Sequence, residues 1–209
     1  MKTLALLSGL LVLAVLWSGP LPELARERFY AHMALHMGVV AVAAPLLSAG
    51  VVKGRWDPVR RWPAWFPPIP LSIVELVIVW AWHTPALHHA ARRGTAGFVV
   101  EQGAFLVAGL LVWLSAFGGG PAMRQERVAA GIVALLLTSM HMTLLGALLA
   151  LSPRALYAHG GSAALTPLED QHLGGAIMLL VGGLSYLLGG LWLTVSLLRA
   201  RIPIGKEEA

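Results

Sequence analysis

Long apolar stretches alternate with short polar segments along this chain. The stretches from Val128 to Leu151 and from Leu173 to Leu198 contain no Asp, Glu, Lys or Arg. A helix needs roughly 20 predominantly apolar residues to cross a bilayer. The pattern predicts an all-α, polytopic membrane helix bundle that forms a single integral membrane domain over residues 1–209. We expect six transmembrane helices, at about 3–17, 31–50, 70–82, 98–117, 128–151 and 173–198.

The first and third of these segments are the shortest. The first follows Lys2 and could be a signal peptide, but Trp17-Ser18-Gly19-Pro20 lacks the small-x-small pattern of a cleavage site. We therefore expect a retained helix. The third lies between Trp62-Pro63 through Pro70 and His83-Thr84-Pro85. Proline limits this helix at both ends because it lacks an N–H donor and clashes with the preceding turn.

Composition agrees with the hydrophobic pattern. Hydrophobic residues make up 57% of the chain and charged residues only 12%, whereas soluble domains carry about 25% charged residues. The chain has no cysteine, which excludes disulfides, thiolate metal sites and a cysteine nucleophile. The net charge of +5 lies in short loops between apolar segments, so it indicates membrane orientation rather than nucleic-acid binding.

The basic residues are unevenly divided between alternate loops. One side holds ten of the 15 Lys and Arg residues and the other side holds five, namely Arg26, Arg28, Arg92, Arg93 and Arg154. Cytoplasmic loops carry the excess of Lys and Arg. Both termini are therefore predicted to be cytoplasmic.

Histidines gather on the opposite, outer side of this predicted topology. Seven lie in outer loops or at outer helix ends and none lies in a cytoplasmic loop: His32, His36, His83, His88, His89, His159 and His172. Of these, His88, His89 and His159 are interpreted as solvated loop residues. The eighth, His141, lies inside the fifth segment, slightly toward the outer side.

The segment Ala31-His32-Met33-Ala34-Leu35-His36-Met37 carries the strongest site signal. Residues four apart share one helix face, so His32 and His36 can point at one metal ion. Met33 and Met37 form a second stripe, turned by about 100° from the first. Hydrogen bonds from the histidines to loops, with the methionines as packing, remain an alternative.

His141 is the second site signal, because an ionisable side chain deep in an apolar segment is a functional hypothesis by default. Met140 and Met142 flank it and repeat the His/Met pairing. One interhelical hydrogen bond could satisfy a neutral histidine instead. Imidazole suits copper, zinc and iron, and thioether selects softer ions such as copper(I). Without cysteine, we expect copper, with zinc or iron as alternatives.

Three carboxylates in or beside the spans have separate interpretations. Asp170 could complete a metal site or cap a helix, and both remain open. Glu101 could orient a histidine, whereas Glu75 lies near the cytoplasmic end and is expected to snorkel or to bond between helices. The stripe of Gln171, Gly175, Met178 and Gly182 predicts close helix packing.

Together these motifs resemble a known family, the CtaG-type cytochrome c oxidase assembly factors associated with caa-type oxidases. The resemblance runs from about residue 29 to 190. It rests on His-Met-x-x-His-Met with Ala44-Pro45-Leu46-Leu47, on Trp82-His83-Thr84-Pro85-Ala86-Leu87, on Met140-His141-Met142-Thr143-Leu144-Leu145-Gly146-Ala147-Leu148-Leu149 and on Asp170-Gln171-His172-Leu173-Gly174-Gly175.

The resemblance implies a non-enzymatic protein of the bacterial plasma membrane that helps to assemble haem–copper oxidase. It implies a membrane chaperone that supplies copper to the oxidase catalytic subunit from the outer side. The implied metal-site residues are His32, His36, His83, His141 and Asp170. The chain departs from the family at Gln102, where the pattern has His, and at His172, where it has Gln.

Two other classes of function remain open. A haem protein could use His36 and His141 as axial ligands. A zinc or iron metalloenzyme could use the histidines and carboxylates, although no H-E-x-x-H motif is present. The expected partners are the oxidase catalytic subunit, other copper chaperones and the lipid bilayer, with a homodimer as a further option and no nucleic acid.

Overall fold

The computed structural model describes residues 1–120, 124–157 and 165–201. Within these ranges the chain is helical and contains no β-strand. The elements in chain order are α1 Lys2–Ser18, α2 Leu21–Glu27, α3 Phe29–Met37, η1 Gly38–Ala43, α4 Ala44–Val51, α5 Pro58–Arg61, η2 Pro63–Trp65, α6 Pro68–Trp82, α7 Pro85–Arg92, α8 Thr95–Phe117, α9 Arg124–Ala150, α10 Pro167–Ile177, η4 Met178–Gly182 and α11 Gly183–Arg201.

The predicted multi-pass membrane bundle is confirmed. Four helical segments are long and apolar enough to cross a bilayer: Phe29–Val51, Thr95–Phe117, Gln125–Ala150 and Pro167–Arg199. Two bent pairs raise the number of spans to six if each pair is one span. These are α1 with α2, bent by 54°, and α6 with α7, bent by 71°.

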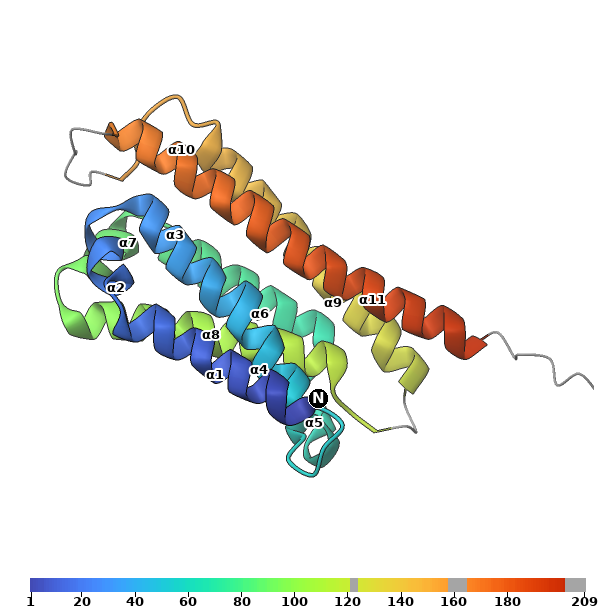
Figure 1. Cartoon of the computed structure of the whole chain (residues 1–209). Coiled ribbons are helices and arrows are strands. Elements are labelled where there is room, and N and C mark those ends of the chain that lie inside the picture. The colour runs from blue at the N-terminus through green and yellow to red at the C-terminus, as the bar shows by residue number, and fades with distance from the viewer. Residues whose placement is uncertain (121–123, 158–164, 202–209) are drawn as a thin grey trace, which may run out of the picture.

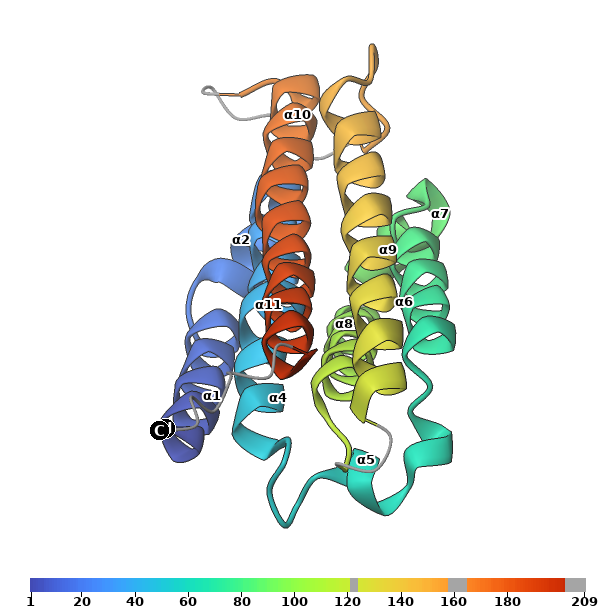
Figure 2. The same ribbon diagram turned by 90° about the vertical axis from the view of Figure 1, so that its right-hand side faces the viewer.

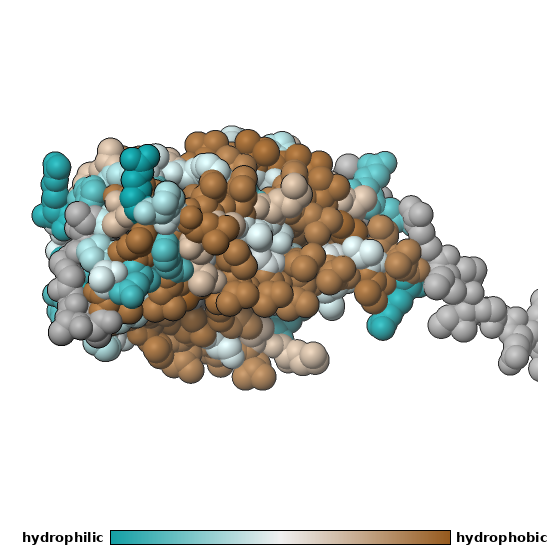
Figure 3. Space-filling model, turned by 90° about the horizontal axis from the view of Figure 1, so that it is seen from above, coloured by the Kyte–Doolittle hydropathy of each residue, from teal (hydrophilic) through white to brown (hydrophobic). Residues whose placement is uncertain are grey.

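The long helices lie side by side and give the bundle two distinct ends (Figures 1 and 2). At one end, here called the α7 end, α2, α7 and the start of α10 lie together. At the other, the α5 end, α5 lies near the first residues of α1, and α11 ends there too. Between the two ends the surface carries a broad band of hydrophobic side chains, as Figure 3 shows for one face. This band fits the lipid-facing part of a membrane protein.

Glycines bring neighbouring helix backbones into close contact. A Cβ atom at Gly175 on α10 would lie 2.8 Å from the carbonyl oxygen of Gly146 on α9. A Cβ atom at Gly50 on α4 would lie 2.9 Å from the backbone nitrogen of Leu6 on α1. Small residues at helix crossings allow such packing in membranes. The close packing predicted for the Gly175 stripe is confirmed.

The π-helical segment η1 changes the backbone hydrogen bonding in the middle of the bundle. Its N–H groups bond five residues back, as Ala44 N–H does to Val39 O, so Pro45, which has no N–H, gives Val40 O no such donor. The Trp113 indole on α8 donates to Val40 O at 2.9 Å, and the Ser185 hydroxyl on α11 donates to Ala41 O at 2.7 Å. Side chains from two other helices therefore satisfy carbonyls that lipid could not satisfy.

Glu75 forms the interhelical bonds that its position predicted. Its side chain is fully buried on α6. The Tyr186 hydroxyl on α11 donates to Oε1 at 2.5 Å, and the Thr138 hydroxyl on α9 donates to Oε2 at 3.0 Å. This carboxyl group therefore connects three helices.

We predict that Ser185→Ala lowers the free energy of unfolding by about 1 kcal/mol, because Ala41 O loses its interhelical donor. Ser196→Ala is the matched control, since the Ser196 hydroxyl donates to Leu193 O within its own helix. Unfolding in mixed micelles measures both variants. Equal effects would show that the interhelical bond to η1 contributes no stability of its own.

Candidate metal centre

Four histidines from three elements converge at the α7 end of the bundle. His32 and His36 lie on α3, His83 follows the last residue of α6, and His88 lies on α7. All four side chains are buried. The His32 and His36 rings are nearly parallel with centroids 6.4 Å apart, which confirms that they share one helix face. The His83 ring lies 5.2 Å from His36 and 5.9 Å from His32.

His83 is oriented as a metal-binding histidine usually is. Its Nδ1–H donates to the Val79 carbonyl at 2.6 Å, and this bond leaves the lone pair on Nε2. Nε2 is buried and has no hydrogen-bond partner among the described residues. Metal-ligating histidines commonly donate their other ring N–H to a backbone carbonyl. The turn that ends α6 thus presents a fixed nitrogen donor to the cluster.

His36 lies one helical turn after His32 on α3, and its ring lacks hydrogen bonds. Its ring packs on Phe105 of α8, with centroids 3.9 Å apart. Neither of its ring nitrogens has a hydrogen-bond partner in the part of the chain that the structure describes. A buried polar group without a partner costs free energy. A bound cation would offset that cost by coordinating one of these nitrogens.

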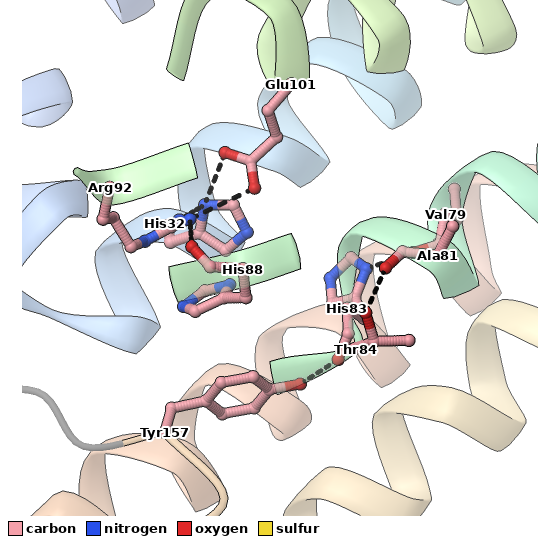
Figure 4. Close-up of polar contacts among 9 residues, drawn as sticks. All are labelled: His32, Val79, Ala81, His83, Thr84, His88, Arg92, Glu101 and Tyr157. Carbon is pink, nitrogen blue, oxygen red and sulfur yellow. Dashed lines mark hydrogen bonds and ion pairs between the residues drawn. The ribbon is translucent and has the colours of Figure 1, made fainter. Parts of the chain in front are cut away.

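His32 belongs to a charged group that includes Glu101 of α8 and Arg92 of α7 (Figure 4). Arg92 Nη2 donates to His32 Nδ1 at 2.5 Å, and Nη1 donates to Glu101 Oε1 at 3.1 Å. Glu101 Oε2 lies 3.8 Å from His32 Nδ1, too far for a hydrogen bond, so the expected orientation of a histidine by Glu101 stays a prediction. One ligand atom each from His32, His88 and Glu101 lie within 4.8 Å of one another.

Tyr157, in the segment between α9 and α10, covers the cluster. Its ring stacks on Phe29 at 4.3 Å and lies 4.4 Å from the His88 ring. Its hydroxyl donates to the His83 carbonyl at 2.6 Å (Figure 4). Burial raises the pKa of the Tyr157 hydroxyl, which therefore keeps the proton that it donates.

The interpretation of His88 as a solvated loop residue is wrong. The chain bends by 71° between α6 and α7 and brings His88 into the bundle, where its side chain is 0% exposed. Sequence reasoning also missed Arg92. A sequence pattern could have indicated both residues. His88, Ala91 and Arg92 follow one another at i, i+3 and i+4, so they share one face of a short helix. His89 is half-buried, and His159 lies outside the described residues.

Asp170 lies on α10 and binds the start of the helix that carries His32. Its two carboxylate oxygens accept hydrogen bonds from the backbone N–H groups of Phe29 and Tyr30, at 2.9 and 2.8 Å. Asp170 therefore caps the start of α3, although it belongs to α10. His172, which stands where the family has Gln, donates from Nε2 to Ser152 O at 2.9 Å.

His141 lies on α9, apart from the ring contacts that join the other histidines. Its side chain is buried, and both ring nitrogens are without a hydrogen-bond partner among the described residues. The alternative of one interhelical hydrogen bond is therefore not found in that part of the chain. Its role as a metal ligand stays a prediction.

The methionines of α3 face away from the histidines. A Cβ atom at Gly174 would lie 3.0 Å from Met33 Cγ, and one at Gly182 would lie 3.0 Å from Met37 Sδ. Met33 and Met37 thus pack on α10 and η4, whereas His36 packs on α8. The close donors at the cluster are accordingly imidazole nitrogens and one carboxylate, a set that suits copper, zinc or iron.

Comparison with known proteins gives one match. The family model for the cytochrome c oxidase caa3 assembly factor (Caa3_CtaG) matches residues 1–200. No curated protein and no solved structure matches the chain.

We predict that Asp170→Asn lowers the free energy of unfolding by about 1–3 kcal/mol, because one of the two α3 amides loses its acceptor. The metal content of the folded protein should stay unchanged. Glu169→Gln is the control, since a glutamine can retain the bond to Thr166 N at the helix start. Chemical unfolding and elemental analysis test this. Loss of metal at unchanged stability would make Asp170 a ligand instead.

Proposed function

The chain belongs to the cytochrome c oxidase caa3 assembly factor family, and we propose that it assists assembly as a membrane copper chaperone. In this role it holds copper at the α7 end and passes the ion to the catalytic subunit of the oxidase. Copper is cargo here, and the protein performs no turnover chemistry.

The observation that carries this proposal is the convergence of buried imidazoles with unpartnered nitrogens. His36 has two such nitrogens, and His32 and His83 each have one at Nε2. Polar groups inside a membrane protein are costly and usually functional. A structural role would account for a histidine that is hydrogen-bonded, but these nitrogens gain a partner only when something enters the cluster.

The positions of the rings support the following ligand assignment. His36 and His83 supply neutral nitrogen donors, and His32 adds a third when Arg92 withdraws. His88 and Glu101 lie close enough to His32 to take part as the ion leaves the cluster. His141, on α9, is assigned to a deeper position on the transfer path.

The α7 end is proposed to face the outside of the bacterial plasma membrane. The opposite end carries most of the basic residues, among them Lys2, Lys53, Arg55, Arg60 and Arg61, and such an excess favours the cytoplasm. Among the described residues, the histidine cluster lies at the α7 end, so in this orientation the cargo site would meet copper that arrives from outside. The oxidase subunit would accept the ion at this end.

A chaperone must also release its ion, and Arg92 supplies a means. Its guanidinium occupies the space between His32 Nδ1 and Glu101, where a bound cation would otherwise lie. The Arg92 side chain is 9% exposed and ends α7, so it can turn outward when the ion enters. Its return restores the Glu101 ion pair and favours release.

The first test is copper titration of purified wild type and of the His32→Ala/His36→Ala variant. We expect saturable binding in the wild type and loss of that binding in the variant, because two of the three nearest nitrogen donors are gone. The His89→Ala/His172→Ala variant is the control, with the same number of imidazoles removed outside the cluster. It should bind copper as the wild type does.

Three outcomes of this titration would contradict the proposal. Binding that is equal in all proteins would place copper elsewhere. Native protein that carries zinc or iron and does not take up copper would show that the cargo is one of those metals instead. A Soret absorption band that depends on His36 would support the haem alternative.

The second test replaces Arg92 by glutamine. Without the competing cation, copper affinity should rise roughly tenfold or more and release should slow, since like charges repel strongly in a buried site. The metal-free protein should lose about 3 kcal/mol of stability because Glu101 is left buried without its partner. Arg93→Gln removes the same charge from an exposed neighbour and is the control. Weaker copper binding in Arg92→Gln would show that Arg92 orients His32 for binding instead.

A further inference from the structure

Three cationic side chains line one cavity at the α5 end, far from the histidine cluster. The cavity has a volume of about 370 Å³ and is lined by Lys53, Arg60 and Arg127, together with Ser196 and the backbone of residues 118–120. The Arg127 guanidinium is held in place by a hydrogen bond from Nη2 to Phe66 O. Its Nε is buried without a hydrogen-bond partner among the described residues.

The positive charge of this cavity is only partly offset by the protein. Among the described residues, the ion pairs within 4.0 Å all lie at the α7 end and involve Glu101. Asp57 is the nearby carboxylate, and its negative charge offsets part of the charge of Arg127. Its oxygens are also hydrogen-bonded to the backbone. Lys53 N, Val59 N and Gly119 N donate to its oxygens at 2.8, 2.9 and 3.1 Å. The cavity thus retains an excess of positive charge that favours an anion.

Lys53 adopts an unusual backbone conformation at this cavity. Its φ angle is +57°, in the left-handed region that non-glycine residues rarely occupy. The hydrogen bond from Lys53 N to Asp57 holds this conformation. The Lys53 ammonium lies 5.9 Å from the Trp192 ring of α11. Such strained residues gather at ligand sites, where the surrounding structure maintains them.

An apolar groove adjoins the cavity and shares Lys53 and Phe117 with it. The groove has a volume of about 730 Å³ and runs between α4, α8 and α11. Pro45, Leu46, Leu188 and Trp192 are among its lining residues. Leu188 and Trp192 are 61% and 57% exposed, so the groove opens on the lipid-facing surface.

We propose that cavity and groove together bind one anionic glycerophospholipid. Its phosphate lies among Lys53, Arg60 and Arg127, where arginine can form two parallel bonds to phosphate oxygens. One acyl chain lies in the groove against Trp192. Free phosphate would leave the groove empty, and a zwitterionic lipid would bring its own cation into a cavity that is already positive. The charge and the adjoining groove therefore select an anionic lipid.

The test is native mass spectrometry of delipidated full-length protein with added palmitoyl-oleoyl phosphatidylglycerol, and with the phosphatidylcholine of the same chains. We expect one phosphatidylglycerol to bind at least tenfold more tightly than phosphatidylcholine. Lys53→Gln/Arg127→Gln should abolish this preference. Arg55→Gln/Arg61→Gln removes two charges from exposed residues at the same end, outside the cavity lining, and should keep it.

A second variant tests the groove without altering any charge. Ala49 is exposed and lines the groove, so Ala49→Trp should fill it and reduce phosphatidylglycerol binding at least fivefold in a folded protein. Equal binding of the two lipids, or equal losses in the two double variants, would overturn the proposal. So would displacement of the lipid by millimolar inorganic phosphate, which would identify a free-anion site, or undiminished binding in Ala49→Trp.

Discussion

Every polar group inside this bundle must find a partner in the protein, because the hydrocarbon of a membrane offers none. The structure meets this constraint in several places. Trp113 donates to the Val40 carbonyl, to which Pro45 has no N–H to offer, Glu75 receives bonds from two other helices, and Asp170 accepts the first amides of α3. Among the described residues, both ring nitrogens of His36 and Nε2 of His83 depart from this rule. The proposed site therefore lies where the constraint is not met.

The same bonds that satisfy buried groups also position the site. Asp170 fixes the start of α3, and with it the direction in which His32 and His36 point. The Val79 carbonyl accepts a hydrogen bond from the His83 ring, and the Tyr157 hydroxyl donates one to the His83 carbonyl. Both bonds fix the position of His83. Arg92 and Glu101 form an ion pair that completes the cluster in the metal-free protein. Substitution of Arg92 is therefore expected to change both stability and copper affinity, because its ion pair with Glu101 lies at the cluster itself.

Much of the fold follows from sequence because apolar length and proline placement limit where membrane helices can lie. The shared face of His32 and His36 also follows, since four-residue spacing fixes it within one helix. The fold-back of α7 does not follow, because the 71° bend after α6 depends on tertiary packing. For that reason His88 and Arg92 were missed. Asp170 was recognised as a cap or ligand, but its partner lies 140 residues away in the sequence.

The most direct test of the central claim is copper K-edge X-ray absorption spectroscopy of the copper-loaded wild-type protein. A site built from His36, His83 and His32 predicts a first shell of nitrogen at about 2.0 Å, with the multiple scattering of imidazole rings. The methionines of α3 pack on other helices, so no sulfur shell is expected. A first shell dominated by sulfur, or one without imidazole scattering, would contradict the proposed copper site.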